Sequence, residues 1–144
     1  MSEENIELVR RWLAWVPDLR DADPADDDAA VEEAFRDYLD EEFVLRIPSY
    51  YPDETPVFKG RDGVARYVAW LRDSWSDWRP WPERFFDADD HVVVFGRIVA
   101  KGRSSGVPIE FPNALVFTIR NGRMTSMQVY TDRPEALKAV GLEQ

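Results

Sequence analysis

The sequence predicts an α+β fold in which helices come first and a curved antiparallel sheet follows. Apolar residues recur at helical spacing through most of the first 80 residues, whereas alternating strand-like segments dominate from residue 84 onward. The turn signals Asp89-Asp90 and Asn121-Gly122 separate those strands, and Asn-Gly is a strong two-residue hairpin signal. A curved sheet wrapped by three helices leaves a conical cavity, which is the usual place for a small-molecule site.

Three helices are expected before the sheet. The first covers residues 3–19, where apolar side chains form one stripe. Asp23-Pro24 is a typical N-cap followed by a first-turn proline, so a second helix is expected from there to about Leu39. A third helix opens at residues 60–63 and is expected to end at Pro80, with an inner stripe of Val64, Tyr67, Val68, Leu71, Trp75 and Trp78.

The remaining segments predict strands and one short helix. Strands are expected at residues 42–47, 84–88, 91–101, 107–120 and 124–131, with an irregular Pro-rich loop at 48–56. Pro108 and Pro112 suggest a bulge or an exposed edge in the fourth of these strands. A terminal helix is expected at 133–140, with Asp132 as its N-cap and Gly141 past its end.

Composition limits the possible functions of the 144-residue chain, which we expect to form one domain, residues 1–144. The net charge of −10 argues against a nucleic-acid or anionic-membrane partner. The absence of cysteine and the single histidine exclude disulfides, thiolate chemistry and Cys- or His-rich metal sites, and neither a cofactor nor a metal is expected. The acidic start and the lack of a long apolar run predict a cytoplasmic protein with no membrane span.

The order of elements and several short segments resemble a known superfamily. The segments are residues 60–64, 87–94, 96–97, 119–124, 129–133, 136–137 and 141–142. In that order they resemble the nuclear transport factor 2-like superfamily, and within it the SnoaL-like group, which includes polyketide cyclases. Ketosteroid isomerases and limonene epoxide hydrolase are relatives. The resemblance covers nearly the whole chain and implies the conical α+β fold, a fold that hosts many functions.

The resemblance also implies where catalytic groups would lie, and this chain departs from the family there. The isomerase base position falls on Arg46, which cannot act as a general base at pH 7. The oxyanion-hole acid falls on Leu115, and the tyrosine that accompanies it lies on the first helix, where this chain offers Trp12 and Trp15. The last-strand acid of the cyclases falls on Val129. The epoxide hydrolase has an arginine and an aspartate two residues apart in the long strand; in this chain Arg97 keeps the arginine and Val99 replaces the aspartate.

Several residues are candidates for binding a ligand. Arg46 and Arg97 are expected to face the cavity, where a guanidinium could bind a carboxylate or an enolate oxygen, unless each pairs with a carboxylate such as Glu110 or Asp87. Asn113 offers a neutral donor and acceptor, unless it bonds to a backbone bulge at Pro112. The other expected ligand contacts are Tyr50 and Tyr51 in the Pro-rich loop, Trp70 outside the main helical stripe, and Leu115 and Val129 on the sheet.

Other polar residues have simpler explanations. Asp53 and Glu54 could supply a base, but carboxylates in loops are mostly solvated. His91 is expected at the surface, and Asp132 is better explained as a helix cap than as an acid in the cavity. The acidic stretch of residues 18–28 lacks EF-hand spacing and suits a solvated helix start better than a cation site.

Two classes of function follow, besides a structural dimer with a filled core. The first is a protein that binds a small apolar or carbonyl-bearing molecule, with isomerase- or cyclase-type proton transfer if it is an enzyme. The second is a non-catalytic dimeric binding or interaction module, which the loss of the family's acids favours. A homodimer is expected in either case, because the exposed sheet face of this fold is commonly paired.

Overall fold

The computed structural model describes residues 2–21, 27–47, 57–130 and 132–141. Four helices lie in these ranges: α1 (Ser2–Asp21), α2 (Asp27–Asp37), α3 (Gly60–Ser74) and α4 (Arg133–Ala139). The predicted cap of the second helix at Asp23-Pro24 and the Pro-rich loop lie outside the described residues. The cap of α4 is confirmed, because Asp132 accepts a hydrogen bond from the Glu135 amide at 3.3 Å.

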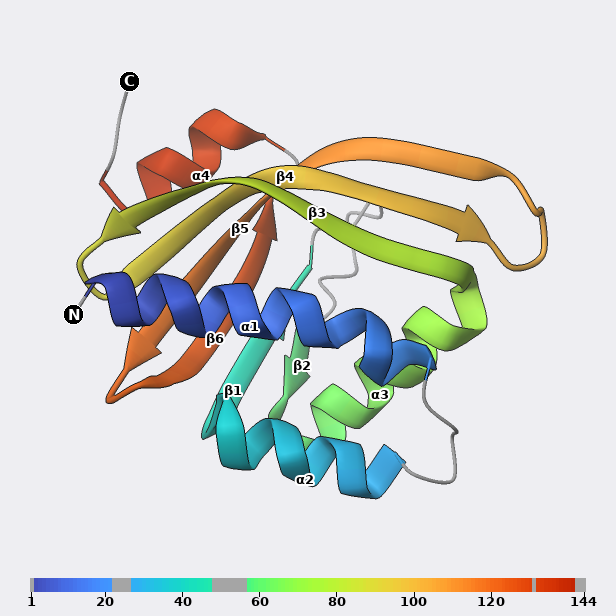
Figure 1. Ribbon diagram of the computed structural model, residues 1–144, viewed down its shortest axis with the longest axis horizontal. Helices are drawn as coiled ribbons and strands as arrows, with labels where there is room; N and C mark the ends of the chain where they lie inside the picture. The colour runs from blue at the N-terminus through green and yellow to red at the C-terminus, as the bar shows by residue number, and fades with distance from the viewer. Residues whose placement is uncertain (1, 22–26, 48–56, 131, 142–144) are drawn as a thin grey trace.

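Six strands form one curved sheet. They are β1 (Leu39–Arg46), β2 (Val57–Lys59), β3 (Trp75–Ala88), β4 (His91–Gly102), β5 (Pro108–Arg120) and β6 (Arg123–Tyr130). Their spatial order is β2-β1-β6-β5-β4-β3. All neighbours are antiparallel except β1 and β6, which run parallel. The predicted α+β class and curved sheet are confirmed, and Figure 1 shows β3, β4 and β5 as a long arm that passes beyond the body.

The start of β3 corrects the sequence prediction. Trp75 and Trp78 were expected to continue the inner stripe of the third helix, but α3 ends at Ser74 and both tryptophans lie on β3. The ladder from β3 to the long strand β4 begins at Trp75 and overrides the helical spacing. Pro80 and Pro82 are tolerated within this strand because β3 is at the sheet edge, where one side of the strand needs no ladder donors.

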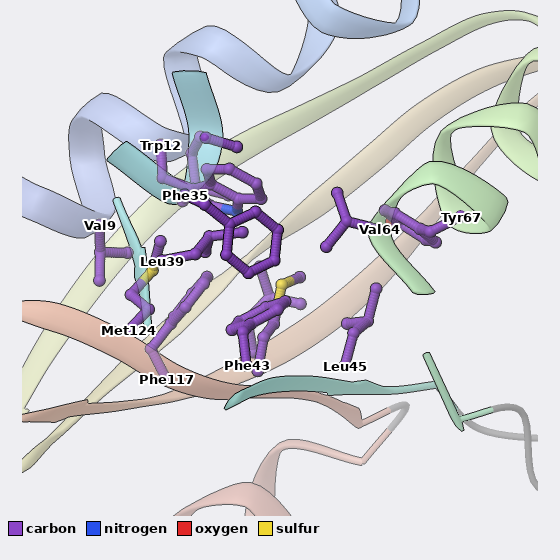
Figure 2. Packing of buried hydrophobic residues seen from close by; sticks show 14 of the residues in the cluster. Val9, Trp12, Phe35, Leu39, Phe43, Leu45, Val64, Tyr67, Phe117 and Met124 are labelled. Carbon is purple, nitrogen blue, oxygen red and sulfur yellow. The ribbon is translucent and has the colours of Figure 1, made fainter. Parts of the chain in front are cut away.

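Two hydrophobic clusters lie on opposite faces of the sheet. The larger cluster joins α1, α2 and α3 to one face, called the inner face below; Figure 2 shows ten of its members labelled. They are Val9 and Trp12 from α1, Phe35 from α2, Val64 and Tyr67 from α3, and Leu39, Phe43, Leu45, Phe117 and Met124 from the strands. The smaller cluster packs Ala136 and Leu137 of α4 against the other face, called the outer face.

The turns that hold the sheet together follow the sequence closely. Asn121 and Gly122 take φ values of +55° and +75°, the left-handed pair that a tight hairpin between β5 and β6 requires. At the far end of the arm, the Arg103 guanidinium donates to the carbonyls of Arg72 at 2.7 Å and Trp75 at 3.2 Å. Arg103 therefore ties the β4–β5 turn to the end of α3, where a cation suits the helix dipole.

Candidate functional site

Alternation along the strands decides which side chains reach the inner face. On β5, Leu115 and Phe117 belong to the larger cluster, whereas Ala114 and Val116 belong to the smaller one. Odd-numbered residues of this part of β5 therefore face α1–α3, and Asn113 shares their side because no bulge separates it from Leu115.

Asn113 is the polar member of the buried set. It is 6% exposed, and it is the one polar or charged residue among the buried residues of the described chain, apart from the tyrosine Tyr67. No hydrogen bond joins its side chain to another residue in the described ranges. The alternative of a bond to a bulge at Pro112 is not seen, because β4 and β5 pair there without a shift in register. The amide atoms of Asn113 are not among the fully buried polar atoms that lack a partner, so water or a ligand can reach them.

The position directly across the ladder from Asn113 carries no side chain. Gly96 of β4 pairs with Asn113, and a Cβ at Gly96 would lie 2.4 Å from the carbonyl oxygen of Trp81. Glycine is thus required here because the backbone of β3 approaches closely at its irregularity between Pro82 and Arg84. The side of Asn113 that faces β4 is consequently lined by backbone.

The two aliphatic site candidates lie on the same face as Asn113. Leu115 is 4% exposed, belongs to the larger cluster and pairs with Val129 of β6. Val129 is half-buried and packs against that cluster. Asn113, Leu115 and Val129 therefore lie on one face of the sheet, and their contact with a ligand stays a prediction.

Arg97 does not lie on the inner face. Val93 and Phe95, which lie two and four residues before it on β4 and so point to the same side, belong to the cluster under α4. Arg97 therefore lies on the outer face. Its guanidinium forms an ion pair with Glu110 and lies 3.8 Å from Glu83. Pairing with Glu110, the alternative considered from the sequence, is what the structure shows.

Arg46 is also on the outer face. It is exposed, whereas Phe43 and Leu45 on the same strand are buried in the larger cluster. It makes no ion pair or hydrogen bond with another described residue, so the alternative of a carboxylate partner is not seen there. The expectation that two arginines converge inside the cavity is therefore wrong in its geometry, because strand alternation directs both of them away from the helices.

Tyr67 is a polar group of the inner face that sequence reasoning assigned to the core alone. It is 8% exposed on α3, and its ring packs against Phe58 at 5.5 Å and Trp70 at 6.0 Å between centroids. No hydrogen bond connects its hydroxyl to another residue of the described ranges. Burial raises the pKa of Tyr67 well above its ordinary value, so the phenol stays protonated and can donate. Its place in the helical stripe gave no sign of this.

The remaining candidates are scattered. Trp70 is 42% exposed and stacks on Tyr67, whereas Tyr50, Tyr51, Asp53 and Glu54 lie outside the described residues. His91 is half-buried at the start of β4.

No metal centre is seen among the described residues, and one surface groove lies away from Asn113. No group of three or more His, Asp or Glu side chains in the described ranges is arranged to hold a metal ion. A surface groove of about 760 Å³ lies at the other end of the sheet, beside the β5–β6 turn, and is lined mainly by polar side chains such as Glu3, Glu7 and Arg120. None of the described helices is both long and apolar enough to cross a membrane.

Comparison with solved structures agrees with this fold. A protein from Jannaschia sp. assigned to the SnoaL-like polyketide cyclases superposes with a TM-score of 0.70 at 18% identity, covering 99% of this chain and 95% of the other. TerC, co-crystallised with polyporic acid, gives a TM-score of 0.69 at 19% identity over 95% of this chain and 98% of its own. A Catenulispora acidiphila protein with a ketosteroid isomerase-like fold, in complex with trimethylamine, gives 0.67 at 16% identity over 94% and 93%.

Sequence comparison identifies the family. A search of curated proteins finds no relative that matches the chain. The model of the SnoaL-like domain matches residues 9–127, which is most of the chain and includes both faces of the sheet. The chain therefore belongs to the SnoaL-like domain family.

Proposed function

We propose that this protein binds a small molecule on the inner face of the sheet, beside Asn113. The observation that carries the proposal is that Asn113 is 6% exposed and has no hydrogen-bond partner in the described chain. Buried polar groups in folded proteins are almost always hydrogen-bonded, to protein, water or ligand. The apolar surroundings contributed by Leu115 and Val129, with one placed polar group, are typical of a small-molecule site.

The buried residues favour binding over proton-transfer catalysis. The described buried set contains no Asp, Glu, His, Lys or Arg that could serve as a base. The positions at which relatives hold their acids are occupied by apolar Leu115 and Val129, as the resemblance implies. Isomerase- or cyclase-type chemistry would therefore need a base from outside the described buried set, and we favour a non-catalytic binding protein.

Retention of a small molecule tests the proposal. The purified protein is examined by native mass spectrometry and, in parallel, by ligand-observed NMR against a mixture of aromatic and aliphatic fragments. We expect binding that is weakened about 5- to 50-fold in Asn113→Leu, the loss that one hydrogen bond accounts for. Gln128→Leu is the matched control, because Gln128 is an amide on the outer face of β6, where Tyr130 packs with the α4 cluster.

The results separate clearly. Equal binding by wild type and Asn113→Leu would show that the amide does not contact the ligand. If neither a retained molecule nor any fragment binds to the wild type, the proposal of a ligand site is wrong, and Asn113 is satisfied by water.

We also propose that two copies associate through the outer face. Trp81 of β3 is 52% exposed there, directly across the ladder from Arg97. Charges of both signs lie on this face, since Arg97 pairs with Glu110 and Glu83 lies 3.5 Å from Arg133. An exposed tryptophan beside charges of both signs suits contact with a second copy across a two-fold axis. Sedimentation should show a dimer that Trp81→Ser weakens, and a wild-type monomer at micromolar concentration would contradict the proposal.

A further inference from the structure

Two steps in the chain have the chemistry for a spontaneous backbone rearrangement. Asn121-Gly122 is the one Asn-Gly step in the sequence, and Asp62-Gly63 is the one Asp-Gly step. In such a step the backbone nitrogen of the glycine can attack the side-chain carbonyl carbon of the residue before it, because glycine has no Cβ to obstruct the approach. The attack closes a five-membered succinimide ring. The fold decides which of the two steps is able to react.

The fold protects Asp62-Gly63. Both residues lie within α3, and Gly63 is buried. A Cβ built on Gly63 would lie 2.5 Å from the backbone carbonyl carbon of Phe58, so β2 packs tightly against this part of the helix. Ring closure would require the glycine nitrogen to leave both the helix and this packing. We therefore expect Asp62-Gly63 to stay intact while the protein is folded.

Asn121-Gly122 has no such protection. Both residues are exposed and line the surface groove beside the β5–β6 turn, which projects at the lower left in Figure 1. Nothing lies within 4 Å of a Cβ built on Gly122. Neither the Gly122 amide nor the Asn121 side chain makes a hydrogen bond to another residue of the described chain. The attacking nitrogen and the carbon that it attacks are therefore both reachable from solvent.

Opening of this turn disrupts little structure. The ladder between β5 and β6 is irregular shortly before the turn, and only two residue pairs lie beyond the irregularity. The pair next to the turn sets Arg120 directly opposite Arg123, and like charges in that arrangement destabilise a ladder. Asn121 also holds a left-handed φ of +55°, a conformation that is unfavourable for L-residues and is released when the turn opens.

We propose that Asn121 is a site of spontaneous modification in the folded protein, where it converts to aspartate and isoaspartate. The Gly122 nitrogen loses its proton and bonds to the Asn121 Cγ, and the side-chain amide leaves as ammonia. Water then opens the succinimide at one of its two carbonyl carbons, which gives either aspartate or isoaspartate. Water is the sole co-reactant.

The two products differ in their effect on the hairpin. Aspartate keeps the length of the backbone, tolerates a left-handed φ as asparagine does, and adds a carboxylate beside the opposed Arg120 and Arg123. Isoaspartate routes the main chain through the side-chain methylene, so the turn gains a backbone atom and no longer fits a two-residue hairpin. The isoaspartate form therefore loosens the pairing of β5 with β6, whereas the aspartate form keeps it.

Peptide mapping of the aged protein tests the site. The purified full chain is incubated at physiological temperature and pH, and acid formation at Asn121 is followed by mass spectrometry. Isoaspartate is counted with protein L-isoaspartyl methyltransferase. The same chain unfolded in urea gives the reference rate, which contains the reactivity of the sequence but no protection by the fold.

We expect Asn121 in the native protein to convert within about 10-fold of the unfolded rate, because turns at hairpin ends open at low free energy. Asn113 is the internal control, since it is buried within β5 and should be protected by more than about 100-fold relative to the unfolded chain. Protection of Asn121 as strong as that of Asn113 would overturn the assignment.

Two variants test the effect on the hairpin. Asn121→Gly keeps residues that suit the turn but lacks the reactive amide, so its Tm should not change on ageing. Freshly purified Asn121→Asp should keep the wild-type Tm, whereas the isoaspartate fraction of aged wild type, isolated by chromatography, should melt about 3–5 °C lower. An isoaspartate fraction as stable as wild type would refute the loosened hairpin, and an equal loss of Tm in aged Asn121→Gly would place the damage elsewhere in the chain.

Discussion

Gly96→Ala is expected to destabilise the fold through a single methyl group. The alanine Cβ would lie 2.4 Å from the Trp81 carbonyl oxygen and 3.0 Å from the Pro82 Cα. Ordinary contact at such a site begins at 3.4 Å, so the nearest atom is about 1 Å too close. The crowded atoms belong to the backbone of β3, which cannot move aside as the end of a flexible side chain can.

The magnitude follows from this crowding. Relieving it requires β3 to shift along part of its ladder with β4, and overpacking of this kind costs about 1–3 kcal/mol. The gain from restricting the unfolded chain offsets only about 0.4–1 kcal/mol of that. We expect a net loss of about 1.5 kcal/mol in the free energy of unfolding, or roughly 5 °C in Tm for a domain of this size.

Urea and thermal unfolding of Gly96→Ala, followed by tryptophan fluorescence, measure this loss. Gly106→Ala is the matched control, since Gly106 has a φ of +66° but no atom within 4 Å of a built Cβ. It tests backbone conformation without crowding and should cost only about 1 kcal/mol. A Gly96→Ala protein as stable as wild type would refute the close approach of β3 to β4.

Three further perturbations test other features. Because burial holds the pKa of Tyr67 above its ordinary 10, the stability that Tyr67 contributes is complete below pH 10 and falls above it by about 1.4 kcal/mol per pH unit. Urea titrations between pH 9 and 11.5 should show this fall in wild type and lack it in Tyr67→Phe. The same dependence of unfolding free energy on pH in both proteins would contradict the prediction. Arg97→Ala removes ion pairs whose side chains are 43–51% exposed, so the free energy of unfolding should change by less than about 1 kcal/mol. Ligand binding should not change, and a loss of binding would place Arg97 at the ligand site. Arg103→Ala removes two hydrogen bonds to backbone carbonyls and should lower the free energy of unfolding by about 1–2 kcal/mol. Amide hydrogen exchange at the β4–β5 turn should become faster, and unchanged exchange would show that Arg103 does not hold this turn against α3.

Local sequence signals predicted much of the secondary structure. Asn121-Gly122 and Asp132 occupy the turn and the cap that their chemistry favours, because those conformations are decided within a few residues. The segment that begins at Trp75 was predicted wrongly, since its aromatic spacing suits a helix and only the ladder with β4 makes it a strand. The three-residue strand β2 was not predicted, because so short an edge strand has no alternating pattern to detect.

Features of the candidate site also fall into those that the sequence predicted and those that only the tertiary structure decided. By itself, the sequence determined the α+β class, the family resemblance and the alternation that puts Asn113 on the same side as Leu115, since these depend on order and spacing along the chain. Tertiary structure alone decided which face of each strand meets the helices, and so placed Arg46 and Arg97 outside. A shift of one residue in a strand exchanges its two faces, so local pattern could not settle this choice. The same packing buried Tyr67 between helix and sheet and so raised the pKa of its phenol, which the helical stripe alone did not predict.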